Sequence, residues 1–470
     1  MTHPRSLSPP LIAPFCGLRP TPDIAGAVIA PHYDVMDTVE ARAFAKERPW
    51  SFLHLSRAGI DLPAGTNPHA AQAYAQAAAQ FLHMRAVGVL RADPAPCYYV
   101  YRATRGAQVQ TGLVLAASVE AYQEGRIRRH ELTLAAKEDD RVRQIEALDA
   151  QTAPAFLLHR RSPAIDDLLA QITEHPPALQ AEAPDAVRDP KRDQHGDRVQ
   201  HQLWVVDQPE QIAQLTAAFE AQPRLYIADG HHRTAAAARI ADGRAQAALG
   251  NRSAHGHWKR FLAVSFPADA LQILAVHRLV RDLNGLNPTT FLRRIAERFD
   301  VTPSETAVLP EAPGLFGLYL DQRWYRLRLH AGRIPHRGSQ ADPVARLDVR
   351  LLQDQLLQPV LGIEDPRQDP RLDFVGGIRG LEGLIRPVDQ GRMRAAFALH
   401  PASLEDLMAV ADAGLTMPPK CTWFETKLVD GLVSLPLDLA ITRDMPDADT
   451  WHAPSPARHP MDAISMSGPA

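Results

Sequence analysis

The chain has 470 residues, 45% of them hydrophobic and 22% charged, which is typical of a soluble globular protein with two or three domains. Its formal net charge of −3 gives no basis for a nucleic-acid partner. The three cysteines, Cys16, Cys97 and Cys421, have no metal-ligand spacing and form no even disulfide set, which favours a reducing compartment. No apolar run is long enough for a signal peptide or a membrane span, so we expect a cytoplasmic protein with no membrane partner.

The first 122 residues are expected to form an N-terminal α/β part. Their pattern predicts strands within residues 11–31, a helix over 37–48, a strand over 49–55, a long helix over 67–86 and a hairpin over 97–119. Pro31 ends the second strand because proline cannot donate to a ladder. Asp34 follows closely, where α/β sheets place ligands, so it is either a substrate-binding residue or part of an ordinary surface loop.

The next segment is the richest in ionisable groups. A helix in its second half would set Lys137, Asp140 and Arg141 on neighbouring faces, either as a solvated face of ion pairs or as part of a binding site. The pair His130 and Glu131 lies just ahead of that helix, beside a basic run. A carboxylate in such a place stays ionised and suits a general base for a hydroxyl or a ligand of Mg²⁺.

The turn after a short apolar run near the middle of the chain is its most informative feature. Asp229 and Gly230 end an expected strand, and an alanine-rich helix follows. Glycine lets the backbone turn sharply, and a helix N-terminus offers unpaired N–H groups and the positive end of the helix dipole. His231, His232 and Arg233 add donors there, which favours a phosphate site over histidines that merely cap the helix. We expect the segment that begins at His130 to lie beside this turn.

The remainder alternates strands and helices. Strands are expected over 153–159, 201–206, 225–228, 261–266, 271–276 and 371–377, helices over 164–173, 209–220, 289–299 and 348–361, and a hairpin over 314–329. Residues 176–200 are polar and are expected to form a loop or a mobile insertion. Lys420 and Lys427 flank a β-prone run and are either surface lysines or phosphate contacts.

Seven short motifs, taken together and in order, resemble a widespread bacterial family of unknown function that is grouped with the free serine kinases of the ParB/sulfiredoxin superfamily. They are Ala13–Pro20, Ala30–Val35, His130–Thr133, Lys137–Arg141, Ala228–Arg233, His277–Arg278 and Met417–Lys420. The resemblance covers about residues 11–433. The chain departs from the family pattern at Cys16, His32 and Cys421, where arginine, proline and serine are usual, and at Glu425.

The resemblance implies a nucleotide-phosphate site at the Asp-Gly-His-His-Arg turn and a carboxylate base upstream of it. The candidate residues form three sets: Glu131, Asp229 and His232 for catalysis; Gly230, His231, His232, Arg233, Lys137 and Arg141 for the nucleotide; and His130, Asp34 and Asp140 for the substrate. Within these sets, the block from Lys137 to Arg141 is assigned from its charge alone. No metal ligand is assigned.

The fold expected is mixed α/β, with a ParB/sulfiredoxin-like nucleotide-binding core over residues 123–282. An N-terminal α/β part over 1–122, a C-terminal α/β part over 283–440 and a disordered tail over 441–470 complete the expected division. The activity expected is a phosphotransferase that uses ATP or ADP with Mg²⁺ and phosphorylates a small hydroxyl amino acid, serine being the first candidate. A homodimer is the assembly considered.

Two other classes of function remain open. A regulatory or clamp protein of the ParB type would bind a nucleotide at the same turn without phosphorylating a metabolite, although no helix-turn-helix or basic face accompanies it. A metal-dependent hydrolase would use His231 and His232 as ligands, but adjacent histidines rarely face one metal ion.

Overall fold

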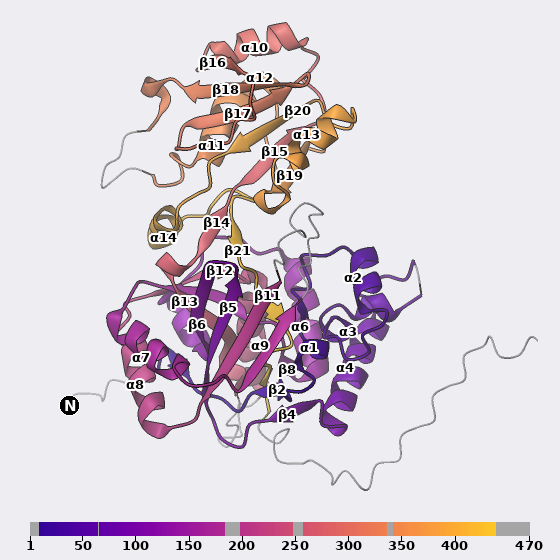
Figure 1. Cartoon of the computed structure of the whole chain (residues 1–470), viewed down its shortest axis with the longest axis vertical. Helices are drawn as coiled ribbons and strands as arrows, with labels where there is room; N and C mark the ends of the chain where they lie inside the picture. Colours follow the sequence, from indigo (N-terminus) through magenta and orange to yellow (C-terminus); the bar gives the residue numbers. More distant parts are fainter. Residues whose placement is uncertain (1–8, 64, 184–197, 248–256, 336–341, 439–470) are drawn as a thin grey trace, which may run out of the picture.

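The computed structural model describes residues 9–63, 65–183, 198–247, 257–335 and 342–438. In this part of the chain the fold is mixed α/β, with a nine-stranded mixed sheet, a six-stranded antiparallel sheet and four two-stranded pairs (Figure 1). The predicted fold class, mixed α/β with several sheets, is confirmed at that level. The expected disordered tail lies outside the described residues, and the domain bounds at 122, 282 and 440 stay predictions.

The nine-stranded sheet has the order β10-β11-β5-β6-β13-β9-β12-β7, and β1 also pairs with β6. Its strands are β1 (Ile12–Ala13), β5 (Tyr98–Arg105), β6 (Gln108–Ser118), β7 (Ile127–Arg128), β9 (Ala155–His159), β10 (Leu179–Ala183), β11 (Val199–Val206), β12 (Leu225–Asp229) and β13 (Arg260–Pro267). Alternate residues of β5 enter different apolar clusters, Tyr99 and Tyr101 on one face and Tyr98 and Val100 on the other. Both faces of the sheet are therefore covered.

Helices and irregular segments cover the two faces of this sheet differently. One face packs against α7 (Pro163–Thr173), α8 (Pro209–Glu220) and α9 (His231–Ala247). Buried alanines on α9, Ala237 and Ala241 among them, let that helix lie close to the strands. The other face packs against α1 (Ala25–Val28), α14 (Leu404–Asp412) and the chain that follows α14.

A group of helices stands beside this sheet and forms its own apolar cluster. It contains α2 (Thr38–Ala45), α3 (Leu53–Ser56) and α4 (Ala71–Ala86), and the remaining elements of this half are α5 (Val119–Gln123), α6 (Ala135–Leu148) and the pair β2 (Leu18–Pro20) with β4 (Leu90–Ala92). The strand predicted over residues 49–55 is wrong. Its apolar residues Phe52, Leu53 and Leu55 are buried in this cluster, and residues 53–56 form the short helix α3.

The polar stretch over residues 176–200 is also not entirely a loop. Residues 179–183 form β10, which pairs with β11 and buries Leu179, Ala181 and Ala183 on alternate positions. Two of these three inward residues are alanines, so the period-2 signal of the strand is weak in the sequence.

The six-stranded sheet has the order β16-β18-β17-β20-β15-β19 and lies above the larger sheet in Figure 1. Its strands and covering helices are β15 (Val276–Val280), β16 (Phe299–Ser304), β17 (Leu315–Leu320), β18 (Arg323–Leu329), β19 (Leu372–Gly376), β20 (Ala395–Leu399), α10 (Pro288–Ala296), α11 (Asp348–Leu352), α12 (Gln358–Leu361) and α13 (Glu382–Asp389). One apolar cluster, which includes Phe291, Phe316 and Leu356, lies between this sheet and α10, α11 and α12, and another, which includes Leu384, lies between the sheet and α13.

After α14 the chain returns to the larger sheet as a strap, defined here as residues 417–437. Along the strap, β21 (Trp423–Glu425) pairs with β14 (Gln272–Leu274), β22 (Val429–Asp430) with β3 (Ala30–Pro31), and β23 (Leu435–Pro436) with β8 (Ala150–Gln151). The strap therefore brings the end of the described chain against its beginning and its middle. No described helix combines the length and apolarity needed to cross a bilayer.

Candidate functional site

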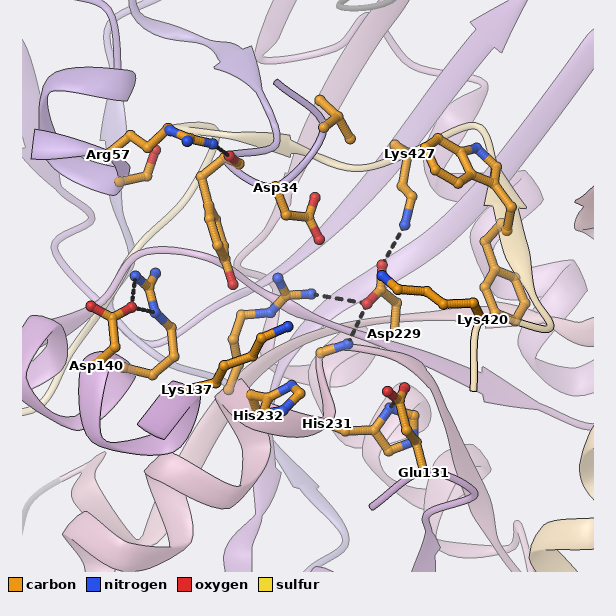
Figure 2. A pocket seen from close by; sticks show the side chains of 18 of the residues that line it. Asp34, Arg57, Glu131, Lys137, Asp140, Asp229, His231, His232, Lys420 and Lys427 are labelled. Atoms are coloured by element: carbon orange, nitrogen blue, oxygen red, sulfur yellow. Dashed lines mark hydrogen bonds and ion pairs between the residues drawn. The ribbon is translucent and has the colours of Figure 1, made fainter. Parts of the chain in front are cut away.

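A cavity of about 970 Å³ lies where the N-terminal helices, the start of α9 and the strap meet (Figure 2). All of the site residues predicted from the sequence line it: Asp34, His130, Glu131, Lys137, Asp140, Arg141, Asp229, Gly230, His231, His232 and Arg233. The two segments expected to lie side by side are in direct contact. The His130 backbone N–H donates to His231 Nε2 at 3.4 Å, and the Leu134 N–H donates to His232 Nε2 at 3.1 Å.

Gly230 forms the sharp turn between β12 and α9. Its φ of +93° is a left-handed conformation that side chains other than glycine rarely adopt. A Cβ atom on this residue would also lie 2.7 Å from Arg233 Nη2 and 2.8 Å from Nε. Glycine is thus required both for the turn and for the close approach of the guanidinium group.

The start of α9 directs unpaired backbone donors at the cavity. The first helical hydrogen bond runs from the Thr234 N–H to the Gly230 carbonyl at 3.0 Å, so the N–H groups of His231, His232 and Arg233 precede the hydrogen-bonded ladder. These amides and the helix dipole favour an anion at this point.

Asp229 is held among positive charges. Its Oδ2 atom lies 2.6 Å from Lys427 Nζ, and its Oδ1 atom accepts the Gly230 N–H at 2.7 Å and lies 3.9 Å from Arg233 Nη2. Burial alone would raise the pKa of this carboxyl, but Lys427 and Arg233 outweigh it and hold the pKa well below its ordinary value. Asp229 is therefore a permanent anion that orders cations around the turn.

Glu131 is in the opposite electrostatic situation. Its side chain is 53% exposed, and its pKa is raised, first by burial against the surrounding protein and then by the negative charge of Asp229. His231 Nδ1 lies 3.6 Å from Glu131 Oε2. Because His231 Nε2 accepts the His130 N–H, we assign the ring proton to Nδ1, where it faces the Glu131 carboxylate.

The histidines of the turn are neutral. Burial, and then the neighbouring His130, lower the pKa of His231 well below its ordinary value, and burial lowers that of His130 to about 4. Burial and then Lys137 lower the pKa of His232 as well. Because His232 Nε2 accepts the Leu134 N–H, its Nδ1–H is left as a donor.

Asp140 and Arg141 form a paired unit at the far end of the cavity. Asp140 Oδ1 is 2.7 Å from His69 Nδ1 and accepts the Tyr74 hydroxyl at 2.6 Å, while Oδ2 accepts Arg141 Nε at 2.9 Å. The Arg141 guanidinium lies over the Tyr33 ring, 4.5 Å from its centroid. Asp140 is therefore engaged with protein groups and positions Arg141.

Sequence reasoning missed several residues that line or support the cavity. Tyr33 and Arg57 line it, and Arg57 donates to the Tyr33 carbonyl at 2.6 Å and to Thr38 Oγ1 at 3.1 Å. Lys427 and Lys420 line it from the strap, where the sequence left them as surface lysines or phosphate contacts. Figure 2 shows Lys137, Lys420 and Lys427 directed toward Asp229 from different sides. Lys420 and Lys427 line the same cavity as Lys137 only because the strap returns to the larger sheet, and no local sequence pattern reveals that return.

A magnesium ion would fit the donors of this cavity. Mg²⁺ in nucleotide sites is held by one or two carboxylates together with phosphate oxygens and water. Asp34 is 43% exposed at the cavity, and its pKa is lowered because the neighbouring His32, Lys427 and Arg233 outweigh the effects of burial and of Asp229. Among the described residues no cluster of three or more His, Cys, Asp or Glu side chains forms a metal site by itself.

A family model described as a protein of unknown function, DUF1015, matches residues 12–350. The chain belongs to this family. No curated protein matches it. The predicted membership in a family of unknown function is thereby confirmed.

Three solved structures are among the distant matches to the chain. A free serine kinase variant in complex with ADP is 12% identical, with a TM-score of 0.33, and the match covers 71% of this chain and 95% of that chain. SbnI with a C-terminal truncation, from Staphylococcus aureus, is 14% identical, with a TM-score of 0.33 and coverages of 72% and 91%. A conserved hypothetical protein from Pyrococcus furiosus is 12% identical, with a TM-score of 0.30 and coverages of 68% and 93%.

Proposed function

We propose that this protein is a nucleotide-dependent phosphotransferase that phosphorylates a small hydroxyl-bearing amino acid, with serine as the first candidate. The observation that carries the proposal is the composition of one cavity. It combines a glycine turn at a helix N-terminus, several converging cations and one carboxylate, Glu131, whose pKa is raised. Phosphoryl transfer requires charge neutralisation, positioning and a base for the acceptor hydroxyl, and little else.

The turn before α9 would hold the nucleotide phosphates. The N–H groups of His231, His232 and Arg233 supply neutral donors, and the His232 Nδ1–H supplies another. Lys137 and Lys420 line the same cavity and have no ion-pair partner within the described residues. Their charges are free to neutralise phosphate oxygens, which accumulate negative charge during the transfer.

Glu131 would be the general base. In the reaction, the acceptor hydroxyl oxygen bonds to the terminal phosphorus of ATP or ADP, the hydroxyl proton passes to Glu131, and the bond from that phosphorus to the leaving ADP or AMP oxygen breaks. A raised pKa improves a carboxylate as a proton acceptor. The His231 Nδ1–H orients it, and Asp229 stays ionised and keeps Lys427 and Arg233 in place.

The finer sequence predictions belong to this proposal. The sequence left the metal ligand unassigned, and within this proposal Asp34 would hold Mg²⁺ when it is bound, so that the ion neutralises phosphate charge. His130 and Asp34 remain the substrate-side candidates, and Asp140 would act through Arg141. A ParB/sulfiredoxin-like core over residues 123–282, a homodimer and a cytoplasmic location are proposed with it.

The test is to incubate the purified protein with Mg²⁺, ATP or ADP and a panel of amino acids, and to detect phosphorylated product by ³¹P NMR. We expect product with the wild type, and a rate about 10²- to 10⁴-fold lower with Glu131→Gln, because the base is removed. Calorimetry should show that Glu131→Gln still binds ADP. Glu146→Gln, on the exposed side of α6, is the matched control and should keep the full rate.

Two other outcomes are informative. Nucleotide binding with no product from any acceptor would contradict the transferase and favour a regulatory protein that binds nucleotide without metabolite phosphorylation. Absence of ATP and ADP binding, or equal binding by the wild type and His232→Ala, would contradict the phosphate site itself.

A further inference from the structure

The turn from Asp229 to Arg233, called here the phosphate turn, contains one buried cation, Arg233. Residues from both ends of the described chain hold this side chain in place. The Arg233 side chain is 8% exposed. Its Nη1 atom contacts His32 Nε2, and His32 Nδ1 lies 2.8 Å from Asp430 Oδ1. His32 is 2% exposed, and Asp430 is fully buried. Three residues separated by about two hundred positions or more thus form one continuous hydrogen-bonded chain.

We propose that the Asp430–His32–Arg233 chain is a positioning device that fixes the Arg233 guanidinium at the phosphate turn, so that the C-terminal strap is an integral part of nucleotide binding. This inference rests on the proposed function, because it assigns Arg233 to phosphate. It adds two positioning residues, His32 and Asp430, and a role for the strap.

The donors and acceptors of the chain allow one arrangement. Arginine is a donor only, so His32 Nε2 must accept from Arg233. The neutral ring then carries its proton on Nδ1 and donates it to Asp430. Asp430 Oδ2 also accepts the Tyr33 N–H at 3.2 Å, which ties the same carboxylate to the backbone beside the cavity. The buried carboxylate therefore sets the tautomer and orientation of His32.

His32 in turn sets the position of Arg233. The guanidinium lies against the Cα face of Gly230 and faces Asp229 at 3.9 Å, while Arg233 Nε has no hydrogen-bond partner among the described residues. An arginine held in this way loses little side-chain entropy when phosphate oxygens bind, so more of the interaction contributes to affinity.

The strap delivers Asp430 by strand pairing. In the β22–β3 register, Asp430 lies opposite Ala30 and Val429 opposite Pro31, and His32 is the next residue along the chain. Lys427, three positions before Asp430, contacts Asp229 on the other side of the turn. The strap therefore supports two sides of the turn, one through Lys427 and one through His32.

The test measures ADP and adenosine affinities of the full-length protein by calorimetry. His32→Phe keeps a buried ring but removes both nitrogens, and we expect it to weaken ADP binding about tenfold or more while adenosine binding stays unchanged. His32→Gln can still accept from Arg233 and should lose less. His159→Phe, which removes a buried histidine bonded to Ser265 in the same sheet and away from the cavity, is the control and should bind ADP like the wild type.

A double-mutant cycle shows whether His32 acts through Arg233. In an Arg233→Met background, His32→Phe should cause no further loss of ADP affinity, because there is no guanidinium left to position. Equal ADP affinity of His32→Phe and the wild type, losses that add in the double variant, or a parallel loss of adenosine affinity would overturn the proposal.

A second readout does not need the nucleotide. ¹⁵N NMR of histidine-labelled protein, with the His32 signal assigned by its absence in His32→Phe, should show the proton on Nδ1 and a bare Nε2. A proton on Nε2, or on both nitrogens at neutral pH, would contradict the proposed Asp430–His32–Arg233 hydrogen bonds even if ADP binds. Failure of the wild type to bind ADP alongside an Nδ1–H signal would contradict the proposed function and the phosphate role of the chain, while leaving its geometry intact.

Discussion

Two carboxylates, one beside each of the two large sheets, lie at the start of a helix, and their pKa values are shifted in opposite directions. Asp229 ends β12 of the larger sheet and precedes α9, and its pKa is well below the ordinary value. Asp348 is the first residue of α11 beside the smaller sheet, and burial raises its pKa to about 7. Asp348 accepts the Gly314 N–H at 2.8 Å, and its Oδ2 has no hydrogen-bond partner among the described residues.

The difference between the two positions is the charge of their neighbours, since burial acts on both in the same direction. Lys427 and Arg233 face Asp229, whereas the charge that acts on the pKa of Asp348 is the negative Asp406. Cations gathered around an already paired carboxylate leave positive charge for a ligand, which is what a phosphate site needs. The surroundings of Asp348 contain no such excess, so this carboxyl is a structural group.

The largest expected effect follows from removing the anion that orders the cations. Asp229→Asn leaves Lys427 and Arg233 without their carboxylate, and we expect the free energy of unfolding to fall by about 3 kcal/mol. Urea denaturation at pH 7 measures this. Asp354→Asn, which breaks an exposed pair with Arg350, should cost less than about 1 kcal/mol. Equal small losses in both variants would show that the cations around Asp229 are adequately solvated without it.

Asp348→Asn should raise the free energy of unfolding at high pH, whereas Asp229→Asn should lower it. The folded-state pKa of about 7 lies above the ordinary 3.8, so the folded protein holds an extra proton between these values and loses stability as pH rises through that window. The amide keeps an acceptor for the Gly314 N–H and carries no charge. We expect it to stabilise the protein at pH 8 by on the order of 2 kcal/mol and by nothing near pH 4. Denaturation at both pH values tests this, and a destabilised variant at pH 8 would contradict the buried-charge account.

Gly230→Ala, compared with a control glycine, distinguishes the two roles of Gly230: its positive φ and the close approach of Arg233. We expect a loss of about 1–2 kcal/mol of stability from the positive φ, together with weaker ADP binding because the added Cβ displaces the guanidinium. Gly285 also has a positive φ of 74°, and a Cβ there would meet nothing within 4 Å. Gly285→Ala should therefore cost stability alone. If ADP affinity fell equally in both variants, the close contact with Arg233 would not matter.

The turn itself could be predicted from the sequence, because its signals are local. An apolar run, Asp229, Gly230 and an alanine-rich helix lie within a few residues, and the charges of residues 130–141 pointed to the neighbouring segment. Most strands and helices were predictable for the same reason. The strand assigned to residues 49–55 was wrong because an apolar run alone does not distinguish a strand from a short helix buried among other helices.

The contacts that support the turn, made by His32, Asp430 and Lys427, could not be predicted, because they join distant parts of the chain. His32 and Asp430 are 398 positions apart, and Lys427 and Asp229 are 198 apart. A lysine that flanks a β-prone run has the same local pattern whether it is solvated or contacts a distant carboxylate such as Asp229. Only the pairing of β22 with β3 and of β21 with β14 shows which of these holds.

The smallest expected effect is a shift in a pH profile, and it depends on two acidic residues of the cavity, Glu131 and Asp229. As the proposed base, Glu131 must be ionised, so kcat/KM should fall as pH decreases through a midpoint above the ordinary 4.5. Asp229 contributes to that elevation through its negative charge. In Asp229→Asn the ionised form of Glu131 is less disfavoured, so the midpoint should move to lower pH.

Lys420→Met should move the same midpoint in the other direction. Lys420 is the cation that most lowers the pKa of Glu131, and without it that pKa should rise further. Asp354→Asn, far from the cavity lining, should leave the midpoint unchanged. Opposite shifts in the two cavity variants would show that the limiting ionisation belongs to a carboxylate between Asp229 and Lys420. A midpoint that moves the same way in both would assign it to a different group and remove Glu131 as the base.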